Sequence, residues 1–474
     1  MSTVTEIRSM IETKGIQFVD FKVVDLFGRW HHLTIPAHRL TEKLLIEGVG
    51  FDGSSYGYLS VNRSDMLFRP DLSTAVIDPF YEHATLSMIG EIYEAGDQVV
   101  RYGQDPRYIA QKTEQLIAQS GIADAVHLGP EFEFYVFDEV RYGTDLRQSF
   151  YEIDSQEGFW NNSRAGGDGY IAPQKGGYHL LPPHDRLADL RNEVTEYLES
   201  VGVGVKYHHH EVGGPGQLEI ETMFGGLLEM ADNSLLIKHA IRNIAVRRGL
   251  TATFMPKPLY GEAGNGFHVH QFLTKEGHNV FNDETGYQGL SQNALYYIGG
   301  ILKHAPSLCG FANASTNSYK RLVPGYEAPV SCVFAAANRS AAIRIPTYIR
   351  DPQVRRMEYR PMDATCNPYL AFSAMVMAGI DGILNRVDPT VAGFGPFEGN
   401  LYDLSPLDKG RIKHLPTSLD EALRALEQDH EYLLRGGVFP KELIDTWVKL
   451  KRDKEIAPIN RMPHPYEFAL YYDL

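Results

Sequence analysis

The chain has 474 residues, of which 43% are hydrophobic and 22% are charged. This composition excludes disordered and fibrous proteins and, at this length, allows about two to four domains. A net charge of −15 argues against a general nucleic-acid binder, which needs a basic surface, so we expect no nucleic-acid partner.

The first hundred residues are mostly β in pattern. Apolar residues at helical spacing predict a short helix over residues 5–14. Two β-rich segments follow, residues 18–25 and 29–35, and the Leu-Phe-Gly run between them predicts a hairpin. A Gly/Ser-rich loop at residues 50–55 precedes further short strands, which continue to about Val100.

The pattern changes at Asp105-Pro106. Asp is a good helix cap and Pro suits the first helical position, so we expect a helix from here to about Gly121. We place a domain boundary before this helix, which divides the chain into residues 1–104 and 105–474.

Beyond the boundary, strands and helices mix. The expected strands are 126–137, 203–210, 218–222, 251–255, 266–273, 341–345 and 356–360. The expected helices are 185–200, 226–248, 289–304, 368–385, 418–434 and 440–452. Residues 141–177, rich in Gly and Asn, predict a long polar loop of the kind that forms lids.

Cysteine usage and apolar stretches bear on the compartment. The cysteines, Cys309, Cys332 and Cys366, are odd in number and form no C-x-x-C pair, which argues for a reducing, cytoplasmic location. The first residues lack the basic-then-apolar pattern of a signal peptide. The most apolar stretch, residues 369–384, is too short to span a bilayer and contains Asp381, so we expect a core helix and no membrane partner.

Acidic residues recur on the predicted strands. Glu131 and Glu133 are two apart on one strand, so both side chains point to the same face, opposite Phe132 and Phe134. Two adjacent carboxylates repel unless a cation or water lies between them. Taken alone, this segment favours the solvated outer face of an amphipathic strand.

Further segments favour a cation site instead. Glu211 and Glu219 flank a turn-forming run, and a hairpin there would bring them together, while His268 and Glu358 lie on two more predicted strands. Five carboxylates and one imidazole suit hard divalent cations, and an oxygen-rich set favours Mg²⁺ or Mn²⁺ over zinc. The consecutive histidines 208–210 alternate faces in a strand and cannot share one ion, so we expect them to be structural.

Arginines are concentrated late in the chain. They are Arg321, Arg339, Arg344, Arg355, Arg356 and Arg360. Surface solvation explains any one of them, but as a group they suit bidentate recognition of carboxylate or phosphate. Arg339 and Arg344 are five apart, so we expect Arg339 in the loop before the strand that carries Arg344. Divalent cations with arginines suit phosphoryl transfer, whereas P-loop and kinase motifs are absent from the sequence.

Five motifs resemble those of the bacterial type I glutamine synthetases, and the resemblance extends over essentially the whole chain. The longest is the run NSYKRLVPGYEAP at residues 317–329. The others are FDGSS at 51–55, GPEFEF at 129–134, MPKP at 255–258 and NPYL at 367–370. The resemblance implies an α+β fold, in which a small N-terminal β-grasp domain precedes a catalytic domain built on a curved antiparallel sheet with surrounding helices.

The resemblance also implies an activity and its cofactors. The family ligates ammonia to L-glutamate with ATP through a γ-glutamyl phosphate intermediate, giving L-glutamine, ADP and phosphate. It uses two Mg²⁺ or Mn²⁺ ions per active site. One ion would be held by Glu133, Glu211 and Glu219, and the other by Glu131, His268 and Glu358.

Further roles are implied residue by residue. Asp52 would take a proton from ammonium in a neighbouring subunit's site, and Glu327 would lie on a flap over the intermediate. The implied catalytic residues are Asp52, Glu327, Arg339 and Arg360. The implied substrate-binding residues are Ser55, Tyr178, Gly264, Arg321, Glu327, Arg339 and Arg360. The implied ATP-binding residues are Phe224, His270, Arg339, Arg344 and Arg356.

Assembly and regulation follow from the same resemblance. Type I enzymes are homo-dodecamers of two hexameric rings, and their C-terminal segment inserts into the opposite ring. Here that segment, residues 466–474, is rich in aromatic and aliphatic side chains. Tyr402 matches a loop tyrosine that is adenylylated in some members, which would make an adenylyltransferase a partner; an ordinary loop tyrosine is the alternative.

Four positions depart from the family pattern. Ala263 removes an Asn that helps hold the amino acid, and Lys206 stands where an acid near the nucleotide is common. Phe272 replaces a Ser and Gln353 replaces a Lys. The predicted metal ligands and arginines are intact. Two alternatives stay open: a γ-glutamyl ligase that uses an amine or polyamine instead of ammonia, and a non-catalytic ring scaffold, which would be expected to have lost ligands.

Overall fold

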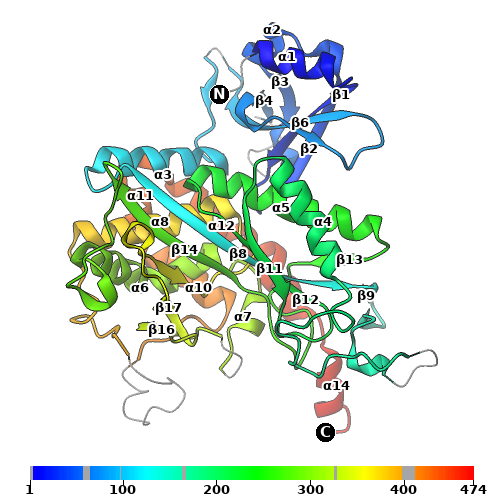
Figure 1. Cartoon of the computed structure of the whole chain (residues 1–474), viewed down its shortest axis with the longest axis vertical. Helices are drawn as coiled ribbons and strands as arrows, with labels where there is room; N and C mark the ends of the chain where they lie inside the picture. Colours follow the sequence, from blue (N-terminus) through cyan, green and yellow to red (C-terminus); the bar gives the residue numbers. More distant parts are fainter. Residues whose placement is uncertain (1–3, 57–63, 97, 163–166, 325–327, 398–411) are drawn as a thin grey trace.

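The structure is a computed structural model that describes residues 4–56, 64–96, 98–162, 167–324, 328–397 and 412–474. Figure 1 shows a small β-rich region at one end, a larger region of sheet and helices, and helix α14 at the opposite end. The predicted α+β class, with a small β region first, is confirmed. Among the described residues, no helix has both the length and the apolar character needed to cross a bilayer.

The N-terminal region is a seven-stranded sheet with the order β2-β1-β6-β4-β3, in which β5 and β7 also pair with β6. The β1–β6 pair is parallel, and the predicted hairpin is present as the antiparallel β1–β2 pair. The elements are α1 (Val4–Thr13), β1 (Phe18–Val24), β2 (Trp30–Pro36), α2 (Glu42–Glu47), β3 (Val49–Asp52), β4 (Asp65–Pro70), β5 (Val76–Asp78), β6 (Thr85–Glu94) and β7 (Val100–Arg101).

One face of this sheet carries a buried cluster of balanced charges. The ammonium of Lys22 lies 3.0 Å from Asp20 and 2.8 Å from Asp78. His32 Nδ1 lies 2.6 Å from Asp20, and His239 Nε2, from the larger region, lies 3.2 Å from Asp78. The lysine and both carboxylates are almost fully buried, so each charge depends on its partners.

The two regions meet at a tight joint. Helix α3 (Pro106–Ser120) begins as predicted, because Asp105 accepts a hydrogen bond from the N–H of Arg107 and Pro106 occupies the first position. The amide of Asn367, the cap of α8 (Pro368–Leu384), donates to the carbonyls of Asp25 and Leu26. At Gly28 the backbone has φ +80°, and a Cβ there would lie 2.7 Å from Asn367 Cα, so this close approach requires glycine.

The larger region is built on a nine-stranded sheet with the order β11-β12-β8-β14-β18-β17-β16, in which β13 pairs with β8 and β15 with β14. Every pair is antiparallel except β16–β17, which is parallel. The strands are β8 (Ala125–Phe137), β11 (Val205–His210), β12 (Gln217–Thr222), β13 (Thr251–Thr253), β14 (Phe267–Lys275), β15 (His278–Asn279), β16 (Ser331–Ala336), β17 (Ala341–Ile345) and β18 (Met357–Tyr359).

Helices pack around this sheet and enclose the main hydrophobic core. The buried α8 packs against α6 so closely that a Cβ on Gly300 would lie 2.6 Å from Gly382 Cα. The remaining helices are α4 (Ala188–Ser200), α5 (Leu227–Arg247), α6 (Gln292–Ala312), α7 (Ser318–Arg321), α10 (Leu419–Gln428), α11 (Glu431–Leu434), α12 (Lys441–Lys451), α13 (Ala457–Arg461) and α14 (Pro465–Tyr471).

Several expectations about elements were wrong. The polar loop expected at residues 141–177 begins with strands β9 (Glu139–Thr144) and β10 (Ser149–Asp154), which form a separate hairpin. The helix expected to end at residue 304 continues to Ala312 through Pro306, because α6 is buried on most sides and packing offsets the lost hydrogen bond. The helix expected over 418–434 is interrupted at Asp429, and β16, α13 and α14 were not expected.

Candidate active site and metal centre

A cavity of about 600 Å³ opens on the nine-stranded sheet of the larger region. It collects most of the residues that the sequence singled out. All six predicted metal ligands line it, namely Glu131, Glu133, Glu211, Glu219, His268 and Glu358. Six predicted substrate or phosphate residues line it too, namely Tyr178, Gly264, Arg321, Arg339, Arg344 and Arg360.

Strand β8 forms the centre of the cavity floor. Phe132 and Phe134 point into the hydrophobic core and are fully buried, so Glu131 and Glu133 face the cavity. These two glutamates are only 9% and 8% exposed. The solvated-face interpretation of this strand is therefore wrong, because carboxylates at this depth need partners.

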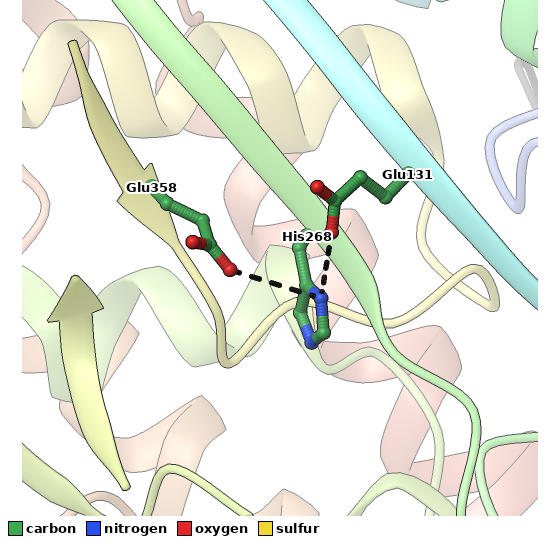
Figure 2. Close-up of side chains that lie close together, drawn as sticks. All are labelled: Glu131, His268 and Glu358. Atoms are coloured by element: carbon green, nitrogen blue, oxygen red, sulfur yellow. Dashed lines mark hydrogen bonds and ion pairs between the residues drawn. The ribbon is translucent and has the colours of Figure 1, made fainter. Parts of the chain in front are cut away.

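One group of possible ligands comes from three neighbouring strands. Glu131 on β8, His268 on β14 and Glu358 on β18 each offer one ligand atom, all within 4.8 Å of one another. Figure 2 shows the three side chains pointing toward one another, with His268 Nδ1 3.1 Å from Glu131 and 3.9 Å from Glu358. The antiparallel β8–β14 register places His268 directly opposite Glu131.

A second group lies on the β11–β12 hairpin. The predicted hairpin forms, and His209, Glu211 and Glu219 offer ligand atoms within 4.8 Å of one another. Glu133 stands opposite Glu219 in the β8–β12 register and lies 3.7 Å from His268 Nδ1, between the two groups. His209 was not predicted as a ligand from the sequence. Its signal was alternation, since a strand residue paired with Glu219 shares that residue's face.

The other two histidines of the run have structural contacts, as expected. His210 is buried, and its Nε2 lies 3.1 Å from Glu157. His208 Nδ1 accepts a hydrogen bond from the guanidinium of Arg191. Only the middle histidine of the run therefore lines the cavity.

The carboxylates differ sharply in electrostatics. Burial, together with Glu133 and Glu219, raises the pKa of Glu211 well above its usual value, and burial with Glu131 and Glu133 does the same to the pKa of Glu219. Burial also acts on Glu358, but Arg360 and His270 outweigh it and lower its pKa to about 2. The hairpin side of the cavity thus has an excess of negative charge that these protein contacts do not balance.

Arginines form the opposite wall. Arg344 and Arg360 each pair with a different oxygen of the Glu358 carboxylate, which therefore lies between the two guanidiniums. Arg321 donates to the carbonyls of Pro361 and Arg360 at 2.8 and 3.1 Å. Arg339 lies in the turn before β17, as predicted, and its carbonyl accepts a hydrogen bond from Arg360 Nε. Arg339 is exposed and lines the cavity, so its guanidinium is accessible to a ligand.

Three of the predicted nucleotide residues, Phe224, His270 and Arg356, do not line this cavity. Phe224 packs over β8, where a Cβ on Gly129 would lie 3.0 Å from its ring, and the Arg356 guanidinium lies 5.2 Å from the ring centroid. Phe272, one of the departures, contacts Phe224 edge-on at 5.2 Å. His270 is buried, and its Nε2 lies 2.7 Å from Glu131. None of these four residues lines the cavity, and of them His270 contacts the carboxylate site, through Glu131.

A third set of possible metal ligands is already partly neutralised by a lysine. Glu131, Glu221 and His270 offer ligand atoms within 4.8 Å, but the ammonium of Lys206 is paired with Glu221. Lys206, another of the departures, thus neutralises a carboxylate at the edge of the sheet. This group therefore carries less uncompensated charge than the hairpin group.

Other predicted residues lie apart from the cavity or outside the described residues. Asp52 and Ser55 belong to the N-terminal region, do not line the cavity and are hydrogen-bonded to each other at 3.0 Å. Hydrogen bonds from Ser54 and Ser55 lower the pKa of Asp52, which keeps this carboxyl ionised. Glu327 and Tyr402 lie outside the residues that the structure describes.

The cavity also contains side chains that the sequence analysis did not assign. They are Lys175, Tyr207, His209, Gln217, Lys257 and Tyr348. Gln217 Nε2 donates to the carbonyl of Gly264 at 3.1 Å and thereby supports the segment that carries this glycine. A signal existed for Lys257, which lies within one of the motifs, but a motif does not reveal where its side chain points.

The chain matches two family models. Residues 15–95 match the model described as "Glutamine synthetase, beta-Grasp domain", and residues 103–471 match "Glutamine synthetase, catalytic domain". A relative from Aquifex aeolicus, described as glutamine synthetase, is 48% identical over 475 residues, which cover 100% of this chain and 99% of the relative. One from Mycolicibacterium smegmatis, with the same description, is 46% identical over 479 residues, with the same two coverages.

Solved structures agree with these matches. A cryo-EM structure of Plasmodium falciparum glutamine synthetase superposes with a TM-score of 0.89 at 28% identity, covering 100% of this chain and 99% of that one. A structure described as "GmaS/ADP complex-Conformation 1" superposes with a TM-score of 0.81 at 26% identity, covering 99% and 100%.

Proposed function

The chain belongs to the glutamine synthetase family, and from that premise we propose that its cavity joins ammonia to the side-chain carboxylate of L-glutamate while ATP is converted to ADP and phosphate. The observation that carries this proposal is the meeting of six metal-type ligands and four arginines in one cavity. Its close relatives, 46–48% identical over nearly their full length, are described as glutamine synthetases. The scaffold alternative loses support, because no predicted ligand is missing.

Two divalent cations fit the carboxylates of this cavity. Half-buried Glu211 and buried Glu219 repel each other and call for a counter-charge, and carboxylate oxygens with one or two imidazoles suit Mg²⁺ or Mn²⁺. Glu131, His268 and Glu358 would hold one ion, and Glu133, Glu211 and Glu219, with His209 nearby, the other. Bound cations would neutralise phosphate oxygens and orient them for transfer.

The arginines would hold the two anionic substrates. Arg321 would bind glutamate near Gly264, where a Cβ would lie 2.9 Å from the arginine side chain. Exposed Arg339 and partly buried Arg344 would bind ATP phosphates, and Arg360 would contact both glutamate and the phosphoryl group in transfer. A carboxylate acylates poorly, so ATP first converts it to γ-glutamyl phosphate, and charge neutralisation by these guanidiniums favours that step.

The nucleotide base would lie near Phe224. The arrangement of Phe224 with Arg356 offers a flat, cationic surface of the kind that stacks on a base. Phe272 and buried His270 complete that environment. The ADP named in the description of a structural relative is consistent with a nucleotide site on this fold.

Ammonium must lose a proton before it can attack the acyl phosphate. We assign this task to Asp52, with Ser55, Tyr178 and Glu327 around the ammonium. Asp52 is exposed and ionised on the N-terminal region and does not line the cavity of its own chain. This position supports a role for Asp52 as the base in the cavity of a neighbouring subunit. Asp52→Ala is expected to lose glutamine synthesis more than glutamate-dependent acyl phosphate formation, and equal losses in single-turnover experiments would contradict the role.

The shared site requires an oligomer, for which we propose a homo-dodecamer of two hexameric rings. Phe468 on helix α14 is 56% exposed, and Tyr472, directly after this helix, is 82% exposed. An apolar groove of about 1,410 Å³ lies between the β9–β10 hairpin and the start of α14, and Tyr142 and Tyr151 line it. This groove suits the tail of a second copy. Deleting residues 466–474 is expected to leave active hexamers, and unchanged dodecamers in light scattering would refute the tail's role.

The amine-using alternative makes a different prediction in a direct assay. Phosphate release from ATP is measured in the presence of glutamate, with ammonium, methylamine, ethylamine or a polyamine as the acceptor. Ammonium is expected to give the highest kcat/KM by far. A preference for any amine would replace ammonia ligation by γ-glutamyl amide synthesis on the same site.

The proposed domain boundary lies between residues 104 and 105, and the separate small core of the N-terminal sheet supports it. The proposed cytoplasmic location is supported by the three buried, free cysteines.

The proposed adenylylation of Tyr402 is tested by the intact mass of protein from nitrogen-replete cells. The absence of an AMP adduct would count against an adenylyltransferase as partner.

A further inference from the structure

A second cavity, of about 710 Å³, lies at the joint between the two regions. The turn after β1, helix α5 and the end of α12 form its walls. Four cationic side chains line it, Arg29, Lys238, Arg242 and Lys451, against one carboxylate, Glu455. This is an unusual concentration of positive charge in a chain whose net charge is −15.

Most of these cations lack an ionic partner. Glu455 is 2.5 Å from Lys451 and neutralises it. Among the ion pairs of the described residues, none includes Arg29, Lys238 or Arg242. By contrast, the buried Arg107 is paired with both Asp71 and Asp232, whereas Arg29 and Arg242 are exposed and only Lys238 of the three unpaired cations is buried.

Lys238 makes the imbalance most severe. It is only 8% exposed, and the one hydrogen bond of its ammonium goes to the carbonyl of Ala364 at 2.7 Å. Burial, with Arg242 nearby, lowers the pKa of Lys238 to about 8, and burial with Arg29 lowers the pKa of Arg242. These cations therefore repel one another, and a buried charge without a partner is costly.

We propose that this cavity binds a small, multiply charged oxyanion of the phosphate or polycarboxylate type. Two guanidiniums that converge on one space match the oxygens of such an anion in bidentate fashion, and the ammonium of Lys238 adds a further donor. The volume accommodates an anion larger than one phosphate group. Because Arg29 and Arg242 come from opposite sides of the joint, the bound anion links the two regions.

The site is separate from the active site, which it resembles only in attracting anions. The two cavities share no lining residue, although Met255 of this cavity and Lys257 of the active site are two residues apart. Phosphate is also a product of the proposed reaction, so a binding experiment must distinguish the two places. Variants of each cavity, tested with the same anions, make that distinction.

The test is calorimetric titration of the full-length protein with phosphate and, separately, with citrate, in chelator and at constant ionic strength. Arg29→Gln/Arg242→Gln is expected to lower the affinity for whichever of the two anions the wild type binds more tightly by at least about tenfold, because two charge-assisted contacts are lost. Arg339→Gln/Arg344→Gln, which disables the active-site arginines, is expected to leave that binding unchanged. Arg248→Gln is the matched control, since Arg248 lies at the same end of α5 and is paired with Glu193. The preferred anion reports whether phosphate or carboxylate chemistry is recognised.

Several results would overturn the proposal. One is that neither anion binds to the wild type. Another is that Arg29→Gln/Arg242→Gln binds the anion with the same affinity as the wild type. Loss of binding in Arg339→Gln/Arg344→Gln alone would assign the anion to the active site. Altered oligomeric state of Arg29→Gln/Arg242→Gln in light scattering would mean that these cations serve a neighbouring copy. Arg29→Lys/Arg242→Lys keeps the charges and is expected to bind with intermediate affinity, which guards against a fold defect in the glutamine variant.

Discussion

Two buried ionic clusters in this chain are built in opposite ways. In the N-terminal sheet, Lys22 lies between Asp20 and Asp78, and two histidines contact the same carboxylates. On the catalytic sheet, Glu211 and Glu219 lie beside further glutamates, and the one ion pair of Glu219 among the described residues is with His209 at 3.6 Å. One cluster is balanced within the chain, and the other has an excess of negative charge.

The pKa values show the difference. Burial raises the pKa of any carboxyl, but Lys22 and the histidines outweigh it, so the pKa values of Asp20 and Asp78 are lowered. For Glu211 and Glu219 burial and the neighbouring carboxylates act in the same direction, and both pKa values are raised. The N-terminal cluster is complete by itself, whereas the proposed function would complete the cluster of Glu211 and Glu219 with bound cations.

Removing one charge from the catalytic cluster is expected to have the largest effect. Glu219→Gln should lower turnover by at least about 10³-fold, because cation stabilisation of the transferring phosphoryl group amounts to several kcal/mol. In chelator the same variant should be as stable as the wild type or more so, since a repulsive charge is gone. Steady-state kinetics and thermal unfolding check both halves. Near-normal turnover, or a large loss of metal-free stability, would break the contrast between the clusters.

The balanced cluster should respond in the reverse way. Asp78→Asn leaves the buried Lys22 with one carboxylate fewer and is expected to cost about 3 kcal/mol of unfolding free energy. Turnover per folded molecule should change little, because Asp78 does not line the active site. Urea denaturation gives the stability and active-site titration the folded fraction. A loss of turnover without a loss of stability would mean that the N-terminal cluster serves the chemistry.

Added cations should stabilise the protein through the carboxylates of the nine-stranded sheet and not through the N-terminal cluster. At a free Mn²⁺ concentration of about 100 times its Kd, the wild type should gain about 2.7 kcal/mol of stability for each bound ion. Asp78→Asn should gain as much, whereas Glu219→Gln should gain clearly less. Thermal unfolding with and without Mn²⁺ measures these gains, and an equal gain in all three proteins would place the stabilising ion elsewhere.

The pH dependence in chelator should have opposite signs in the two clusters. Because the folded-state pKa of Glu219 is raised above 4.5, its favourable contribution is complete below pH 4.5 and is lost as pH rises through the folded-state value. Glu219→Gln should therefore gain stability relative to the wild type as pH increases above 4.5. The contribution of Asp78, whose pKa is lowered from 3.8, is present above pH 3.8 and is lost below it. Unfolding curves across pH check this, and parallel profiles for wild type and Glu219→Gln would contradict it.

Part of the fold and of the candidate site could be predicted from the sequence. Alternation on β8 placed Glu131 and Glu133 on one face, and the Asp-Pro signal located α3 to the residue. The depth of these glutamates was not readable, because burial depends on which strands lie beside β8. The same reason hid His209, which matters only through its partner across the hairpin.

The basic cavity was invisible for a related reason. Arg29 and Arg242 are more than 200 positions apart, and nothing in either segment reports that a helix and a turn will meet. Helix α6 was predicted too short because Pro306 usually ends a helix, and only burial on most sides explains why it does not. Long-range packing, not local propensity, accounts for these gaps.

We propose that the excess carboxylates of the nine-stranded sheet hold two divalent cations. Equilibrium dialysis with Mn²⁺, followed by elemental analysis, counts the ions per chain in the wild type and in Glu219→Gln. The account predicts two tightly bound ions in the wild type and one or none in the variant, with Asp78→Asn unchanged from the wild type. The same count in the wild type and in Glu219→Gln would contradict it.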